Sequence, residues 1–141
     1  MTRALVGLTM RSLDVLDGAV TVAQFRLLLV LDEIGRVPSS RLAARLGTLA
    51  SSVTRLADRL EATGLLARGH DPDNRSIVTV EVTSAGRDLV ARVVARRHVL
   101  LADVLDRMTP AERADAARAA SRFAELAGGA GEALAVGPLP L

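Results

Sequence analysis

A very short connection between two helical patterns constrains this chain most. Apolar residues recur at helical spacing in residues 39–46 and again in residues 50–63, and only residues 47–49 separate the two segments. Because so short a link cannot extend as a loop, the second helix must turn sharply and pack across the first. The spacing therefore predicts a helix-turn-helix unit.

The second of these two helices is predicted to have distinct inner and outer faces. Its apolar residues fall on one face, which turns the polar residues outward. The outer face is short, polar and partly cationic. The apolar residues are Val53, Leu56, Ala57 and Leu60, and the outward ones are Ser51, Ser52, Arg55, Asp58 and Arg59.

Behind this helix the pattern changes from helical to extended. Gly64 ends the helix, and residues 65–68 can pair with residues 77–82, where valines alternate with polar or outward side chains. The intervening residues 69–75 are rich in turn formers and end in an arginine. We expect a hairpin whose loop projects from the body as a wing.

Two further helices are predicted in front of the helix-turn-helix. Leucines at roughly helical spacing indicate one over residues 4–17. A capping box of Thr21 and Gln24 opens the next helix, which ends at Gly35. Ser39 is expected to cap the first helix of the helix-turn-helix.

Two more helices are predicted behind the hairpin. Thr83 caps residues 84–108, whose apolar positions keep helical spacing over a length unusual for a small domain. A second capping box, Thr109 with Glu112, starts a last helix that reaches about Ala127.

These elements predict one mainly α domain with a small β-hairpin wing. The domain spans residues 1–127, with a winged helix-turn-helix core at about 21–83, and residues 128–141 form a C-terminal tail. The apolar stripes of residues 4–17 and 84–127 have no evident partner within one small domain, so a two-fold contact between copies would cover them. The alternative is that the two stripes pack on each other within one chain.

The composition argues against several classes of protein. The chain has no cysteine, which excludes disulfides, thiolate zinc sites and thiol redox sensing. Neither histidine shares a helical face with another good ligand, and no phosphate-cradling glycine loop or nucleophile beside a histidine is evident. We therefore predict no metal, no cofactor and no enzymatic activity. Without a run of about 18 apolar residues or an apolar leader, the chain is predicted to be cytoplasmic and free of the membrane.

The positive charge is concentrated in one segment. All 18 basic residues are arginines, and residues 36–75 hold seven of them against four acidic residues, while the rest holds eleven against twelve. A basic segment on an otherwise balanced chain suggests a polyanionic partner. A solvated arginine face is the commoner explanation of so small an excess.

The run LAARLGTLASSVTRLADRLEATGLLARGHDPDNRSIVTVEVTSAGR resembles the core of the MarR family of bacterial regulators. The likeness rests on LA and LG around the first helix of the motif, VTRLADRLE on the second, GLLAR before the hairpin, and a Val-Thr pair followed by a glycine at the return to a helix. The flanking helices match the family's order over nearly the whole chain.

This resemblance implies a homodimer held by its first and last helices, with the second helix of the motif in the DNA major groove and the wing beside the minor groove. It implies a sequence-specific double-stranded DNA-binding transcription regulator, a repressor that a small lipophilic or aromatic anion relieves. A two-fold dimer would read an imperfect palindrome. The alternative function is a winged-helix protein-interaction module without DNA binding.

The chain departs from the family pattern at two places. Thr48 and Leu49 stand where the family usually has Leu-Ser after the turn glycine, so Thr48 is the substitute cap. In the wing, Arg75 and Ser76 occupy two adjacent positions where the family commonly has arginines. Either Arg75 makes the wing contact after a one-residue shift of the loop, or it is a solvated loop residue.

The predicted DNA contacts come from both helices of the motif and from the wing. Hydroxyl groups at a helix start donate to phosphates, and Arg55 can bridge O6 and N7 of guanine unless it pairs with Asp58. Arg75 is expected to enter the minor groove, oriented by Asp73 or Asp58. Arg59 is expected to pair with an acid, and capping alone also explains Ser39. The predicted contacts are Ser39, Ser40, Thr48, Ser51, Ser52, Thr54, Arg55, Asn74 and Arg75, with Asp58, Arg59 and Asp73 as supporting residues.

Overall fold

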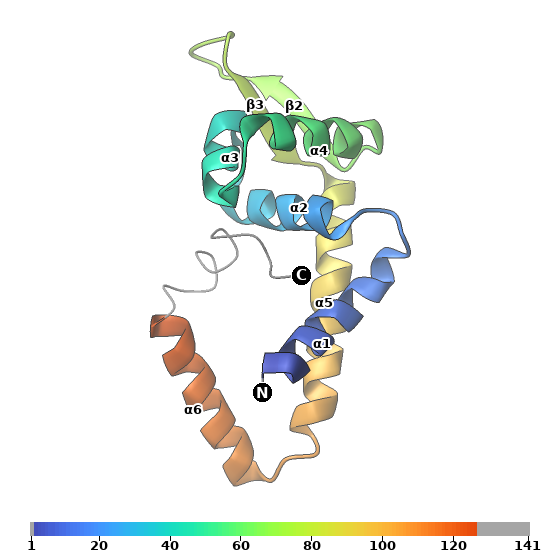
Figure 1. Cartoon of the computed structure of the whole chain (residues 1–141), viewed down its shortest axis with the longest axis vertical. Coiled ribbons are helices and arrows are strands. Elements are labelled where there is room, and N and C mark those ends of the chain that lie inside the picture. The colour runs from blue at the N-terminus through green and yellow to red at the C-terminus, as the bar shows by residue number, and fades with distance from the viewer. Residues whose placement is uncertain (1, 127–141) are drawn as a thin grey trace.

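The computed structural model describes residues 2–126, which form six α-helices, one 3₁₀ helix and three strands. Figure 1 shows α2, α3, α4 and the sheet gathered at one end, and α1, α5 and α6 running to the other. The predicted tail and the expected helix end at Ala127 lie outside the described residues. The elements are α1 (Thr2–Ser12), η1 (Leu13–Leu16), α2 (Val22–Ile34), β1 (Val37–Pro38), α3 (Ser39–Leu46), α4 (Ala50–Ala62), β2 (Leu66–His70), β3 (Val78–Val82), α5 (Ser84–Leu105) and α6 (Pro110–Leu126).

The first helical segment matches its prediction, with one difference in its last turn. Helix α1 begins at Thr2, and the final turn tightens into the 3₁₀ helix η1. Asp17 (φ 45°) and Gly18 (φ 73°) then adopt the left-handed conformation. This backbone reversal ends the helix where the sequence predicted.

Helix α2 lies at the centre of the core. Its predicted capping box is confirmed: the Thr21 backbone N–H donates to Gln24 Oε1 at 2.7 Å, and the Gln24 N–H donates to Thr21 Oγ1 at 3.2 Å. The side chains of Leu27, Leu28 and Leu31 have no exposed surface. Helix α2 contacts α3, α4, α5 and β3, so the helix-turn-helix, the central strand of the sheet and the long helix α5 all pack on it.

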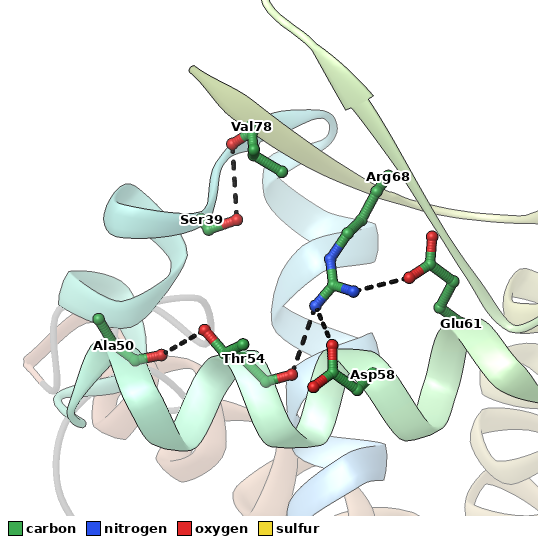
Figure 2. Close-up of polar contacts among 7 residues, drawn as sticks. All are labelled: Ser39, Ala50, Thr54, Asp58, Glu61, Arg68 and Val78. Carbon is green, nitrogen blue, oxygen red and sulfur yellow. Dashed lines mark hydrogen bonds and ion pairs between the residues drawn. The ribbon is translucent and has the colours of Figure 1, made fainter. Parts of the chain in front are cut away.

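The prediction that Ser39 caps α3 is wrong. The N-cap position belongs to Pro38, and Ser39 is the first residue of the helix. The cause is a short strand that the sequence did not reveal: Val37 pairs with Val80, and Pro38 pairs with Thr79. The Ser39 hydroxyl instead donates to the Val78 carbonyl at 3.5 Å (Figure 2).

The three strands form an antiparallel sheet in the order β1-β3-β2. The predicted hairpin is confirmed but is longer toward its loop, because β2 runs to His70, which pairs with Val78. Val80 and Val82 are buried, whereas Val78 is 40% exposed where β3 extends beyond the body.

Helix α5 starts in very close contact with the hairpin. The Thr83 hydroxyl accepts from the Gly86 N–H at 3.1 Å, which confirms the predicted cap. A Cβ atom on Gly86 would lie 2.6 Å from Val82 Cγ1 and closer still to the Leu65 carbonyl oxygen. Only glycine therefore allows α5 to sit at this distance from the turn before β2.

Helix α6 confirms the second predicted capping box. The Thr109 N–H donates to Glu112 Oε2 at 2.8 Å, and the Glu112 N–H donates to Thr109 Oγ1 at 3.3 Å. The backbone and then the hydroxyl of Thr109 lower the pKa of Glu112 by bonding to its charged form. No residue of α6 is buried within its own chain among the described residues.

Replacing Gly86 by alanine should destabilise the fold. We expect Gly86→Ala to lower the free energy of unfolding by about 1–3 kcal/mol, because the new methyl group meets backbone that cannot turn aside. Urea unfolding followed by circular dichroism measures the change.

Gly7→Ala is the matched control, since a Cβ there would meet only the end of the Arg11 side chain at 3.9 Å. In this helical position alanine should be favourable by about 0.5–1 kcal/mol. Equal stability of Gly86→Ala and the parent protein would contradict the close approach.

Candidate nucleic-acid interface

The turn between α3 and α4 has the tight geometry that the sequence predicted. Gly47 is left-handed (φ 61°), and the Thr48 N–H donates to the Ala43 carbonyl at 3.2 Å. The expectation that Thr48 caps α4 is wrong, because the N-cap position falls on Leu49, which makes no side-chain cap bond. Leu49 is 73% exposed. The start of α4 therefore stands in solvent without a side-chain cap.

Helix α4 presents the faces expected from its sequence. Val53, Ala57 and Leu60 are buried at no more than 1% exposure. The opposite face carries exposed polar side chains, while Ser52 and Leu56 are half-buried at its edges. The exposed residues are Ser51, Thr54, Arg55, Asp58 and Arg59.

Two guanidinium groups on this face are unpaired. Within residues 2–126, neither the Arg55 nor the Arg59 guanidinium makes a hydrogen bond or an ion pair. The expected pairing of Arg59 with an acid is therefore wrong, and the alternative pairing of Arg55 with Asp58 does not occur. The outer face of α4 thus presents two cations to solvent.

Arg68 on β2 holds the acids of α4 instead. Its Nη2 lies 2.7 Å from Asp58 Oδ1, and its Nη1 lies 2.7 Å from Glu61 Oε2 (Figure 2). Nη2 also donates to the Thr54 carbonyl at 3.4 Å. Partial burial lowers the pKa of Arg68, but the hydrogen bond and charge of Asp58 and the charge of Glu61 raise it overall. The sequence did not reveal this cluster, because its members come from different elements.

The hydroxyl groups predicted to touch DNA differ in their surroundings. Thr54 donates to the Ala50 carbonyl at 3.0 Å, a bond within the helix (Figure 2). Ser40, Thr48 and Ser51 are exposed. Ser40, Thr48 and Ser51 are therefore accessible to a ligand, whereas the Thr54 hydroxyl donates its proton within α4.

The wing loop is organised by Asp71, which the sequence did not single out. Its carboxylate accepts the Asp73 N–H at 2.9 Å and the Asn74 N–H at 3.2 Å. Asn74 Oδ1 in turn accepts the N–H and the hydroxyl of Ser76, at 3.1 and 2.6 Å. The amide oxygen of Asn74 thus serves the loop itself. An aspartate followed by amides it can bind was the available signal.

Arg75 stands exposed at the wing without the predicted orienting acid. Asp58 is bound by Arg68, and Asp73 makes no ion pair with Arg75 within the described chain. Arg75 instead lines a shallow hollow with His70, Asp71 and Pro72. The proposed orientation of Arg75 by Asp58 or Asp73 is therefore wrong.

A second arginine ties the base of the wing to the body. Arg36 Nε donates to Thr79 Oγ1 at 3.0 Å, and its Nη2 donates to the His70 carbonyl at 3.1 Å. These bonds join the link before β1 to both strands of the hairpin. The wing loop is held internally by Asp71 and at its base by Arg36.

Residues 2–126 contain no group of three or more His, Asp or Glu side chains arranged to hold a metal ion. No helix in this part is long and apolar enough to cross a membrane.

Removing the Asp71 carboxylate should loosen the wing. In Asp71→Ala we expect amide hydrogen exchange at Asp73 and Asn74 to become at least about threefold faster, because both amides lose their acceptor. NMR-detected exchange measures this. Asp73→Ala is the control, because its carboxylate accepts none of these bonds, and it should leave the Asn74 rate unchanged. Equal rates in Asp71→Ala and the parent would show that another group orders the loop.

The sequence of the winged core matches a known family. Residues 20–78 match the MarR family. The HTH-type transcriptional repressor MdtR of Bacillus subtilis (strain 168) is 33% identical over 108 residues, which cover 77% of this chain and 70% of MdtR.

Solved structures share the fold over most of the chain. RV1404 from Mycobacterium tuberculosis has a TM-score of 0.83 and 34% identity, covering 91% of this chain and 87% of that protein. FabT of Streptococcus pneumoniae, solved in complex with DNA, has a TM-score of 0.70 and 17% identity, covering 90% of this chain and 91% of FabT.

Proposed function

The chain belongs to the MarR family of transcriptional regulators, and from this premise we propose that it binds double-stranded DNA sequence-specifically through α4 and the wing. The observation that carries the proposal is the outer face of α4, where Arg55 and Arg59 stand unpaired on the second helix of a helix-turn-helix. Curated relatives are named as regulators of transcription, which is a non-enzymatic role.

In this proposal α4 enters the major groove. Arg55 is the leading base contact, since an unpaired guanidinium can donate to O6 and N7 of guanine. Thr48, Ser51 and Ser52 stand near the uncapped start of α4, where hydroxyls and backbone N–H groups suit phosphate. Ser39, Ser40, Thr54 and Asn74 complete the proposed contact set.

The wing is proposed to lie beside the minor groove with Arg75 as its cation. A narrow minor groove attracts arginine by its negative potential. Because Asp71 and Asn74 fix the loop internally, Arg75 needs no orienting acid. The likeness to FabT, whose structure contains DNA, favours DNA over a protein as the partner.

We further propose that two copies associate through α1, α5 and α6. Helix α1 packs on α5 within the chain, which is the alternative that the sequence left open for the two apolar stripes. Apolar side chains of all three helices nevertheless remain exposed. Phe123 and Leu126 on α6 are 74% and 70% exposed. A two-fold contact would cover these surfaces and present two copies of α4 to an imperfect palindrome. The other exposed residues are Leu5, Val6, Met10, Val99, Val104 and Leu105.

The proposed regulator is a repressor that works in the cytoplasm on the nucleoid as a single-domain protein. The name of MdtR as a repressor supports the sign of regulation. Relief by a small lipophilic or aromatic anion stays a prediction from the family resemblance.

Arg55→Ala and Arg75→Ala should weaken DNA binding in different ways. Loss of Arg55 should cost about 1–3 kcal/mol and flatten the preference at one base position, because a bidentate contact to guanine is lost. Loss of Arg75 should weaken binding to many sequences equally and reduce the salt slope by about one ion. Fluorescence anisotropy with matched and single-base-changed operators at several salt concentrations measures both effects.

Arg107→Ala is the control for the loss of one positive charge. Arg107 is exposed in the connection between α5 and α6, at the opposite end of the molecule from α4 (Figure 1). It should bind like the parent. If Arg75→Ala also matches the parent at every salt concentration, Arg75 is a solvated loop residue.

The oligomeric state tests the proposed association. Light scattering at micromolar concentration should give twice the chain mass of 14.8 kDa. Phe123→Glu should shift the protein toward the monomer, because it places a charge in the proposed apolar contact. Ser121→Glu adds the same charge about half a turn away on α6 and should leave the mass unchanged. A monomeric parent that binds a palindrome tightly would refute the dimer.

A further inference from the structure

One acid on the proposed DNA-facing helix stands within reach of its leading base-contact residue. Asp58 follows Arg55 by three positions on α4, and residues three apart on a helix are neighbours that form ion pairs. Asp58 is exposed, with a side-chain exposure of 55%, so burial does not restrain it. An Arg55–Asp58 pair would turn the guanidinium away from a ligand and neutralise it.

In the structure Asp58 pairs with Arg68 instead. Its guanidinium reaches α4 from β2 and lies 2.7 Å from Asp58, while its other terminal nitrogen lies 2.7 Å from Glu61 (Figure 2). With a side-chain exposure of 26%, Arg68 is more shielded from solvent than either acid. Glu61 and the Thr54 carbonyl act as further anchors that fix the direction from which Arg68 holds Asp58.

The charged side chains of α4 balance one another without Arg68. Arg55 and Arg59 carry two positive charges, and Asp58 and Glu61 carry two negative ones, so the helix alone has no net charge over these four residues. Arg68 adds one positive charge and occupies both acids. Of the two acids, only Asp58 stands three or four positions from an arginine of the outer face, and that arginine is Arg55.

We propose that Arg68 is a positioning residue that keeps Arg55 available for a base contact by holding Asp58. This inference rests on the proposed DNA binding and assigns Arg68 no contact with DNA. Arg68 acts through Asp58 on Arg55. Strand β2, which leads into the wing, would therefore determine whether the Arg55 side chain of α4 is free to contact a base.

Four variants test whether Arg68 acts on Arg55 through Asp58. Two are the single variants Arg68→Met and Asp58→Asn. The other two combine Arg68→Met with Asp58→Asn and with Arg55→Ala. Methionine keeps the aliphatic stem of Arg68 and removes its charge. Arg68→Met should weaken operator binding two- to fivefold, as expected from capture of Arg55 in an exposed ion pair, and should flatten the same base preference as Arg55→Ala. Asp58→Asn added to Arg68→Met should restore both affinity and preference.

The background without Arg55 separates this role from a direct contact. If Arg68 acts through Arg55, Arg68→Met should cost nothing further in Arg55→Ala. An equal loss in both backgrounds would show that Arg68 itself contacts phosphate and would overturn the proposal. A loss that Asp58→Asn does not restore would indicate a merely structural role and would also overturn it. Arg107→Met serves as the charge-matched control and should bind like the parent.

A measurement without DNA keeps the inference separate from the proposed function. NMR of the Arg55 Nε–H in the free protein should show a changed shift in Arg68→Met that titrates with a carboxylate, and the parent shift in the double variant. An unchanged Arg55 signal in Arg68→Met would refute capture by Asp58. Failure of the parent to bind DNA while this signal changes would refute the proposed function alone.

Discussion

The burial of α2 among its neighbours is the interaction on which the rest of the structure depends. Leu27, Leu28 and Leu31 have no exposed surface, and full burial of such a side chain contributes about 1.5–3 kcal/mol relative to its exposure. Helices α3, α4 and α5 and strand β3 all contact α2. Because α3 and α4 share this support, the tight turn at Gly47 can fix the angle between them without a cap at the start of α4. The outer face of α4 is then positioned by what its inner face contacts.

The sequence predicted those features that depend on local interactions. Both capping boxes form as expected, because Thr21 with Gln24 and Thr109 with Glu112 are close in the chain and satisfy each other's backbone donors. Helical periodicity likewise identified the buried face of α4. Two other predicted caps, Ser39 and Thr48, are wrong because the helix starts fall on different residues, Pro38 and Leu49 being the N-caps.

Features that depend on contacts between distant segments escaped prediction. Strand β1 exists because Val37 meets β3, more than forty residues later, and this pairing moved the start of α3. Arg68 was invisible for a related reason: its acids lie on a helix, but it approaches from a strand. In the proposal above, its pairing with Asp58 also keeps the Arg55 guanidinium unpaired. The pattern along a helix shows which side chains are neighbours. It does not show which partner an acid binds when another element supplies a competing cation.

The length of helix α5 and its close contact at Gly86 affect how the two ends of the molecule move relative to each other. The helix is continuous over 22 residues, which at about 1.5 Å per residue makes a rod of roughly 33 Å. One end of α5 packs directly against the turn before β2, because Gly86 has no side chain that would hold the two apart. A rod seated so rigidly acts as a lever: a tilt of about 10° displaces its far end by roughly 6 Å over that length. In the proposed dimer, small angular changes among the terminal helices would thus become large changes in the separation of the two α4 helices. That separation must match one turn of DNA, about 34–36 Å, for both copies to bind at once.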